Sequence, residues 1–157
     1  NVAENELQGN ELAARVEAYA REHGSVAVAI SARIEAEIAQ LAAAERAEFL
    51  RELGLSEPGL HRVVRAAYRL LGLKTFYTAG PKEVRAWTVR DDATAPEAAG
   101  AIHTDFQRGF IRAEVISYDS FVAGRGEQGA REAGELRLEG KTYVVREGDV
   151  IHFRFNV

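Results

Sequence analysis

Two short polar segments have the residue types needed to recognise a nucleotide base. Asn1, Val2 and Glu4 lie in the opening Asn-Val-Ala-Glu, which places an amide and a carboxylate three positions apart. An amide and an acid can together hydrogen-bond the edge of a purine ring. Ser31 and Ala32 follow a short apolar run, where a backbone N–H could also face a base. Each segment alone is equally typical of an ordinary surface loop.

A second group of candidates combines cations with the single tryptophan. Residues 110–116 and 150–155 alternate between apolar and polar side chains, which predicts two strands with one polar face. Interleaved cations and rings can bind phosphate and stack on bases. The candidates for RNA or ribosome contact on this face are Arg85, Trp87, Arg112, His152 and Arg154. In the alternative interpretation Trp87 belongs to the core, and the arginines form a solvated face balanced by Glu114.

The sequence contains no evident catalytic or metal-binding constellation. The four histidines lack a spacing such as His-x-x-x-His and there is no cysteine, so we expect no metal site. His103 and Asp105 suggest a helix C-terminus and its turn rather than a proton relay, because near neighbours do not face each other on a helix. A Gly-Lys-Ser/Thr phosphate-binding loop is also missing, so we expect no catalytic residue in this chain.

Composition limits the class of protein. The 157 residues carry a formal charge of −4 and are 46% hydrophobic and 28% charged, as in ordinary globular proteins. No apolar run approaches the length of about 18 residues that a membrane span needs. The acidic balance argues against broad coating of nucleic acid, and we expect a cytoplasmic protein without membrane or DNA partners.

The first half of the chain is expected to be α/β. Residues 10–23 have helical periodicity with Asn10 as cap, and Gly24 ends that helix. Residues 25–30 form an uncharged, β-branched run, which predicts a parallel strand buried on both faces. Three helical stretches follow, and Ser56 is the expected cap of the third, with Pro58 in its first turn.

The second half changes to strands near Lys74. Strands are predicted at 74–80, 83–89, 110–116, 136–138, 142–145 and 150–155, with a short helix from Ala95 to His103. The glycine-rich residues 124–134 are expected to be a loop with one weak helical turn. Strand, strand, helix, strand and hairpin is the order of an α+β β-grasp (ubiquitin-like) domain. The expected division is therefore 1–73 and 74–157.

Several long motifs resemble the carboxy-terminal part of the YchF/Obg-like ATPase family. They are KTFYTAGPKEVRAWTV, APEAAGAIHTDFQRGFIRAEVISYDSF, LEGKTYVVREGDVIHFRFNV and the opening NVAE. The resemblance covers essentially the whole chain. It implies that the chain is the carboxy-terminal portion of a longer protein, in which a P-loop nucleotide-binding domain with a helical insertion precedes a TGS domain of β-grasp fold.

The resemblance also assigns roles to residues. It implies that Asn1 to Glu4 is the base-specificity motif, with Glu4 favouring ATP over GTP, and that Ser31 and Ala32 form the last nucleotide-binding loop. Residues 1–73 would be the end of the nucleotide-binding domain with connecting helices, and 74–157 the TGS domain. The phosphate loop, the Mg²⁺ ligands and the switches would lie upstream, so we expect this chain alone neither to hydrolyse ATP nor to bind it tightly.

Two functions from different classes follow. The first is the carboxy-terminal part of an ATP-binding and ATP-hydrolysing, translation-associated protein, monomeric, with the ribosome or ribosomal RNA as partner. The second is a β-grasp module that binds ribosomal RNA or protein independently of nucleotide.

Overall fold

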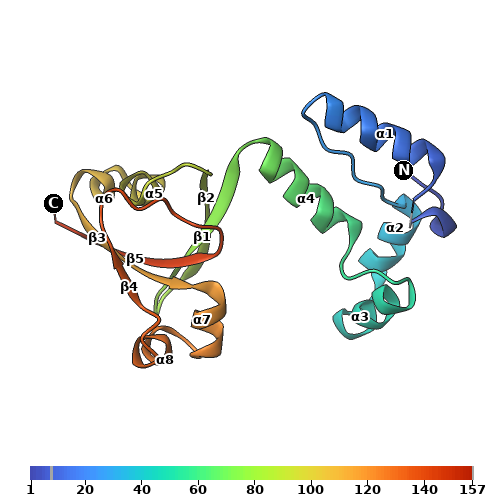
Figure 1. Cartoon of the computed structure of the whole chain (residues 1–157). Helices are drawn as coiled ribbons and strands as arrows, with labels where there is room; N and C mark the ends of the chain where they lie inside the picture. Colours follow the sequence, from blue (N-terminus) through green and yellow to red (C-terminus); the bar gives the residue numbers. More distant parts are fainter. Residues whose placement is uncertain (8, 157) are drawn as a thin grey trace. The chain divides into compact units, whose positions relative to one another are not determined.

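The structure is a computed structural model that describes residues 1–7 and 9–156, shown in Figure 1. The chain divides into two compact units, Asn1–Leu71 and the part from Gly72 onward. Each unit has its own buried cluster, and each is described by itself below. In the described part of the chain, no helix has the length and apolar character needed to cross a bilayer.

The first unit is helical and has a small core. Its elements are η1 (Glu4–Glu6), α1 (Glu11–Glu22), α2 (Ala32–Gln40), α3 (Ala43–Glu52) and α4 (Gly59–Leu70). Asn10 caps α1 as predicted, because its Oδ1 accepts a hydrogen bond of 2.7 Å from the Ala13 N–H. Ile34 and Ile38, one helical turn apart on α2, are buried against Leu50 of α3.

Helix α4 starts differently from the prediction. Pro58 occupies the cap position, and no local side chain caps the helix, so the assignment of Ser56 was wrong. The cap comes from α2 instead: Glu35 accepts hydrogen bonds from the backbone N–H groups of Gly59 (2.8 Å) and Leu60 (3.2 Å). A carboxylate satisfies two free N–H groups at a helix N-terminus and is favoured there by the helix dipole.

Residues 25–30 are not a strand, contrary to the prediction. The segment is extended, but it pairs with no strand among the described residues. The Ala29 carbonyl oxygen accepts a hydrogen bond of 2.8 Å from Arg62 Nη2. The Ile30 carbonyl oxygen accepts one of 2.8 Å from the Val2 N–H. An apolar run becomes a strand only where neighbouring strands supply its hydrogen bonds, and this unit supplies none.

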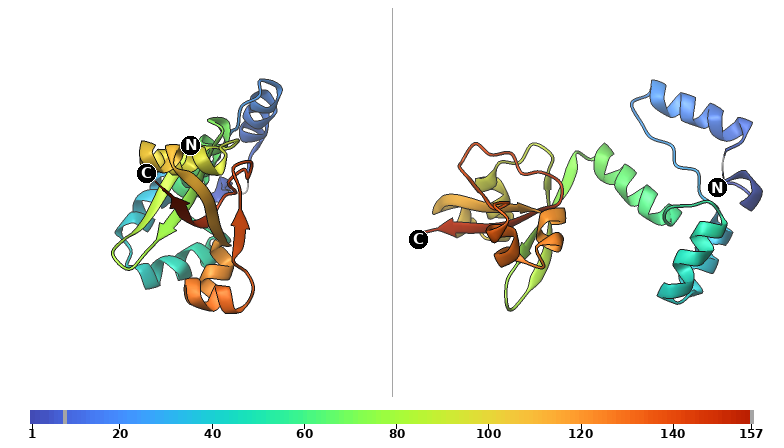
Figure 2. Two further views of the ribbon diagram at one scale, coloured as in Figure 1. Left: turned by 90° about the vertical axis from the view of Figure 1, so that its left-hand side faces the viewer. Right: turned by 60° about the horizontal axis from the view of Figure 1, so that its bottom comes forward.

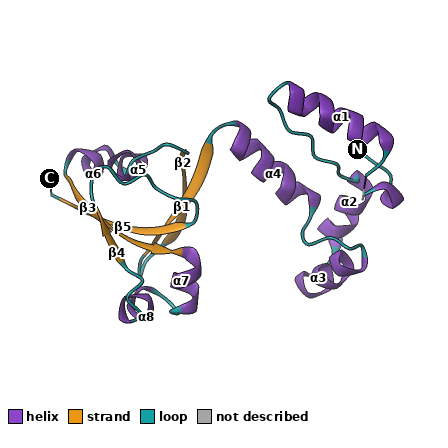
Figure 3. Cartoon of the chain, in the orientation of Figure 1, coloured by secondary structure: helices purple, strands orange, loops and turns teal. Residues whose placement is uncertain are grey.

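The second unit is a five-stranded mixed sheet with helices on both faces. The strands are β1 (Leu73–Ala79), β2 (Val84–Arg90), β3 (Phe110–Ser117), β4 (Arg137–Glu139) and β5 (Asp149–Phe155), coloured orange in Figure 3. They lie in the order β2-β1-β5-β3-β4. β1 and β5 are parallel, with Tyr77 opposite Val150, and the other neighbours are antiparallel.

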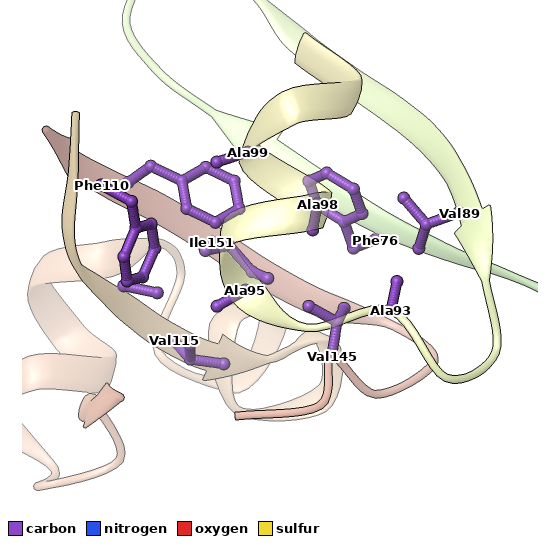
Figure 4. Close-up of a cluster of buried hydrophobic side chains, with 12 residues drawn as sticks. Phe76, Val89, Ala93, Ala95, Ala98, Ala99, Phe110, Val115, Val145 and Ile151 are labelled. Atoms are coloured by element: carbon purple, nitrogen blue, oxygen red, sulfur yellow. The ribbon is translucent and has the colours of Figure 1, made fainter. Parts of the chain in front are cut away.

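The core lies between the sheet and helix α5 (Ala95–Ile102). Figure 4 shows three small residues of α5 (Ala95, Ala98 and Ala99) against side chains of the sheet that include Phe76 and Ile151. Small residues let the helix approach the sheet closely, and large rings from the strands fill the remaining space. Glu97 reaches back to the Thr94 N–H (2.7 Å), and Pro96 stands in the first turn, so α5 begins where the sequence predicted.

Three further helices surround the sheet. α6 (Thr104–Arg108) follows α5 on the same side, while α7 (Tyr118–Ala123) and α8 (Glu127–Glu132) lie across the sheet from it (Figure 2). Residues 124–134 were expected to be a loop with one weak helical turn, and the structure has the six-residue helix α8 there, which packs against α7. The packing is so close that a Cβ added at Gly129 would lie 2.0 Å from the Gly124 carbonyl oxygen.

Strand β3 contains an irregularity that changes its faces. The register with β5 shifts between Phe110 and Arg112, so Phe110 and Ala113 both face the core. Ile111 was expected on the core side with Ala113 and Val115, but it is 56% exposed. An extra residue in one strand turns the following side chains by one position, which explains the error.

A buried polar network fixes the loop before β5. Asp149 is 2% exposed and accepts hydrogen bonds from the Tyr143 hydroxyl (2.7 Å) and the Arg146 N–H (2.8 Å). Burial, and next the hydrogen bond to Asp149, raise the pKa of Tyr143 to about 12. Residues 142–145, predicted as a strand, make only an isolated bridge from Val144 to Thr94. The side-chain network therefore holds this loop in place of a ladder.

Candidate functional site

The structure brings the five predicted base-recognition residues together at the start of α2. Asn1 Oδ1 accepts a hydrogen bond of 2.9 Å from the Ala32 N–H, so the amide holds the loop. The Val2 N–H bonds the Ile30 carbonyl oxygen at 2.8 Å, and Ser31 is 2% exposed. These contacts join two segments that are thirty residues apart in the sequence.

A cavity of about 500 Å³ opens beside these residues. It is lined by residues 1–5, Ser31 and Arg33. Glu4 faces Arg33, with 2.7 Å between Oε1 and Nε, and Arg33 also approaches Glu37 at 3.5 Å. Since the side chains of Glu4 and Arg33 are 45% and 76% exposed, the pair is weak and can open for a ligand. Arg33 also lines the cavity but was not among the predicted site residues. Its position directly after Ser31 and Ala32 could have indicated it.

The side chains of Asn1 and Glu4 in this cavity are of the types that can hydrogen-bond a base. The Asn1 amide retains its NH₂ donors and Glu4 offers carboxylate acceptors, which are the groups that read a purine edge. In residues 1–7 and 9–156, no group of three or more His, Asp or Glu side chains is arranged to hold a metal ion. The donors and acceptors of Asn1 and Glu4 are thus chemically suited to a base, and the described residues include no such group for a metal ion.

The second predicted group is divided between two faces of the sheet. Trp87 stands opposite Phe76 in the β1–β2 register and packs against the core, so it lies on the α5 side. Its indole N–H donates to Thr78 Oγ1 (2.9 Å), and the Arg85 guanidinium lies 4.2 Å from the ring centroid. Trp87 and Arg85 are thus neighbours, as expected, but the core packing of Trp87 matches the alternative interpretation.

Arg112, His152 and Arg154 belong to the opposite face and are exposed. Arg112 is paired with Arg154 across the strands, and His152 with Glu114. Arg154 is occupied, because its Nε and Nη2 each bond a carboxylate oxygen of Glu114 at 3.1 Å. The hydrogen bond from Arg154 lowers the pKa of the buried Glu114 carboxyl. Among the described ion pairs none includes Arg112, which leaves its charge free for a partner.

A second cavity, of about 490 Å³, was missed by the sequence analysis. It lies between the β1–β2 turn (residues 78–83), helix α6 and the end of β5, and its walls include Trp87, Phe106, Phe153 and Phe155. The sequence does contain one indication of it. Phe153 and Phe155 are two positions apart, so both lie on the core face of the predicted strand, close to its end.

Comparisons with known proteins place these features in a family. Residues 73–156 match the family model YchF-GTPase_C, described as a protein of unknown function (DUF933). The whole chain is 59% identical to "Ribosome-binding ATPase YchF" of Haemophilus ducreyi and 56% identical to the protein of that name from Escherichia coli O157:H7. The chain spans 43% of the length of each of these relatives.

Solved structures agree with this match. The chain is similar to the Schizosaccharomyces pombe YchF GTPase, with a TM-score of 0.74 and 30% identity, over 94% of this chain and 39% of that one. A GTP-binding protein from Pyrococcus horikoshii shares the fold, with a TM-score of 0.62, 18% identity, and coverage of 94% of this chain and 42% of that one. The chain belongs to the YchF family, and its residues 73–156 are the part that the carboxy-terminal family model describes.

Proposed function

We propose that the chain is the carboxy-terminal part of a YchF-type protein that binds and hydrolyses ATP and associates with the ribosome in the cytoplasm. The observation that carries the proposal is the match of all 157 residues to proteins named "Ribosome-binding ATPase YchF" at 53–59% identity. Hydrolysis is proposed for the intact protein, because the chain spans less than half the length of these relatives and its sequence contains no Gly-Lys-Ser/Thr phosphate-binding loop.

In this proposal residues 1–73 end the nucleotide-binding domain. The cavity beside Asn1, Glu4 and Ser31 would receive the adenine, and Glu4 would favour ATP over GTP, as the family resemblance implies. Residues elsewhere in the intact protein would hold the phosphates and Mg²⁺. The extended segment 25–30 supports this role, since it pairs with no strand among the described residues and could join a sheet completed by the rest of the intact protein.

Residues 74–157 would be a TGS domain of β-grasp fold. The support is the sheet order β2-β1-β5-β3-β4, with α5 following the first hairpin and packing on one face. The domain would contact the ribosome or ribosomal RNA as a monomer, and no DNA contact is proposed. The contact residues would come from the two groups described above, Arg85 with Trp87 and Arg112 with His152 and Arg154.

Arg112 offers the cleanest test of ribosome contact. Arg154 is unsuitable, because Arg154→Glu would place a second carboxylate against the buried Glu114. We expect Arg112→Glu to weaken co-sedimentation of the chain with ribosomes about tenfold and to reduce its salt dependence. Arg15→Glu on α1, also an exposed arginine, is the matched control. Equal sedimentation of Arg112→Glu and Arg15→Glu would remove the outer face of the sheet as a contact.

The second candidate function is a module that binds ribosomal RNA or protein without regard to nucleotide. It is favoured by the exposed Arg112, which belongs to the second unit and has no ion pair among those described, whereas the base-reading residues belong to the first unit. The two candidates differ in the intact protein: ribosome binding that changes between ATP and ADP supports the first. Identical binding with either nucleotide and with none supports the second.

A further inference from the structure

The cavity at the β1–β2 turn has features of a binding site that the proposed function does not use. Its volume of about 490 Å³ is within the usual range for small-molecule pockets. Its floor is the edge of the core, where Phe153 is 6% exposed. We call this cavity the hairpin pocket and define it by Thr78, Lys82, Trp87, Phe106, Phe153 and Phe155.

Two aromatic surfaces border the hairpin pocket. Phe106 and Phe155 are stacked, with centroids 3.8 Å apart and planes inclined by 24°, and Phe155 remains 36% exposed. Trp87 is held by its hydrogen bond to Thr78, and Arg85 covers its ring. Rings that are fixed before binding lose little conformational freedom when a flat partner stacks on them. The walls are therefore suited to a planar ring.

The rim of the pocket carries Lys82 and the carboxylate of Glu83, and Arg85 lies beside it over the Trp87 ring. Lys82 lies in the turn, and no ion pair of its ammonium group is among those described. Arg85 is 3.8 Å from Glu83, a long and exposed pairing that leaves much of its charge available. The Thr78 hydroxyl accepts the bond from Trp87 and keeps its own proton to donate. A flat ring carried on an anionic chain matches this combination.

We propose that the hairpin pocket binds one unpaired nucleotide of a single-stranded RNA. The base stacks on the Phe106–Phe155 pair, and the adjoining phosphates face Lys82 and Arg85. This inference rests on the proposed contact of the second unit with ribosomal RNA, and it names the element of RNA that is recognised. A duplex keeps its bases stacked and is excluded by this geometry.

The only tryptophan of the chain lies in the pocket, so its fluorescence reports on occupancy directly. The 157-residue chain is titrated with a five-nucleotide adenosine RNA, with an abasic oligomer of the same length, and with AMP. We expect the RNA to change the Trp87 emission saturably, and the abasic oligomer to bind at least about tenfold more weakly, because stacking is lost. AMP that binds as tightly as the RNA would overturn the proposal in favour of a free-nucleotide site.

Two variants locate the binding. Phe155→Ala removes the exposed ring and should weaken the RNA about tenfold. Lys82→Glu should weaken it and lower the slope of log affinity against log salt by about one. The controls are Leu138→Ala, an exposed apolar residue on β4, and Lys141→Glu, an exposed lysine far along the sequence. Circular dichroism shows whether Phe155→Ala is folded. If it is not, the RNA affinities of Lys82→Glu and Lys141→Glu are compared, and equal affinities would overturn the proposal.

Two further outcomes separate this inference from the proposed function. Ribosome co-sedimentation without any effect of RNA on Trp87 emission would overturn the pocket and leave the proposed function standing. RNA binding at Trp87 without co-sedimentation would support the pocket and count against ribosome contact. Tighter binding of an acidic peptide containing one phenylalanine than of the RNA would also overturn the proposal.

Discussion

Removal of one hydroxyl, in Tyr143→Phe, should destabilise the second unit measurably. The hydroxyl donates at 2.7 Å to Asp149, a residue that is 2% exposed. A hydrogen bond to a buried charged group contributes about 1.5–3 kcal/mol, so a loss of about 2 kcal/mol is expected. In a unit of this size, a loss of that magnitude lowers Tm by about 10 °C.

Thermal unfolding followed by Trp87 fluorescence measures this effect, because the single tryptophan lies in the same unit. Tyr118→Phe is the matched control: its ring is 53% exposed, and its hydroxyl has no partner among the described hydrogen bonds. A Tyr143→Phe protein that melts within about 2 °C of Tyr118→Phe would refute the reasoning. Asp149 would then be satisfied by the Arg146 N–H and Arg137 alone.

The pH dependence gives a second check on the same residue. The pKa of Tyr143 is raised from 10.0 to about 12, because burial and the bond to Asp149 favour the neutral phenol. A raised pKa contributes stability that is present below the unfolded value and is lost as pH rises through the folded value. The stability difference between wild type and Tyr143→Phe should therefore be constant below pH 10 and shrink between pH 10 and about 12.

Two further substitutions test the close contact between α7 and α8 and the capping of α4. Gly129→Ala should destabilise the second unit by about 1–3 kcal/mol in urea unfolding, since its Cβ would overlap the carbonyl oxygen of Gly124, directly after α7. Gly140→Ala, with open space around it, should unfold like wild type, and equal midpoints for the two variants would contradict the close packing. Glu35→Ala removes the cap of α4 and should cost about 1–2 kcal/mol, read as faster amide hydrogen exchange at Gly59 and Leu60. Unchanged exchange there would show that Glu35 does not cap the helix.

Local patterns in the sequence predict most of the second unit, because its elements carry their own signals. The alanine-rich run with Pro96 near its start locates α5, and the alternation of 150–155 locates β5 and its faces. Only a loop with one weak helical turn was predicted at 124–134, because the glycines there are typical of a loop. Those glycines are needed for close contact between two helices, a requirement that exists only in three dimensions.

The failures share a cause, which is a partner distant in sequence. The cap of α4 comes from Glu35, twenty-four residues before Gly59, so the local Ser56 was chosen instead. Residues 25–30 look like a strand but have no neighbouring strand to bond. The bulge at Ile111 depends on the register between β3 and β5, which no single-strand pattern contains.

Only part of the candidate site could be predicted, because sequence motifs do not show which residues from distant segments share a face. Asn1 and Ala32 were chosen from short motifs, and the hydrogen bond between them agrees with their grouping. The second group does not form one surface. Which residues of β2 and β3 share a face is determined by how the strands pair in the sheet, and not by the sequence of either strand. Trp87 therefore lies on the core side, and Arg112 on the other.

The central position of β5 has a consequence for the order of folding. β5 is the last strand in the sequence, yet it lies between β1 and β3 and joins the two halves of the sheet. During synthesis the β1–β2 hairpin can form early, but no strand links it to β3 until residues 149–155 have left the ribosome. Closing the long loop between β1 and β5 before their contacts form is entropically costly and slows folding. The unit should therefore fold late and as a whole, and a chain that stops before Asp149 should expose the apolar faces of both halves.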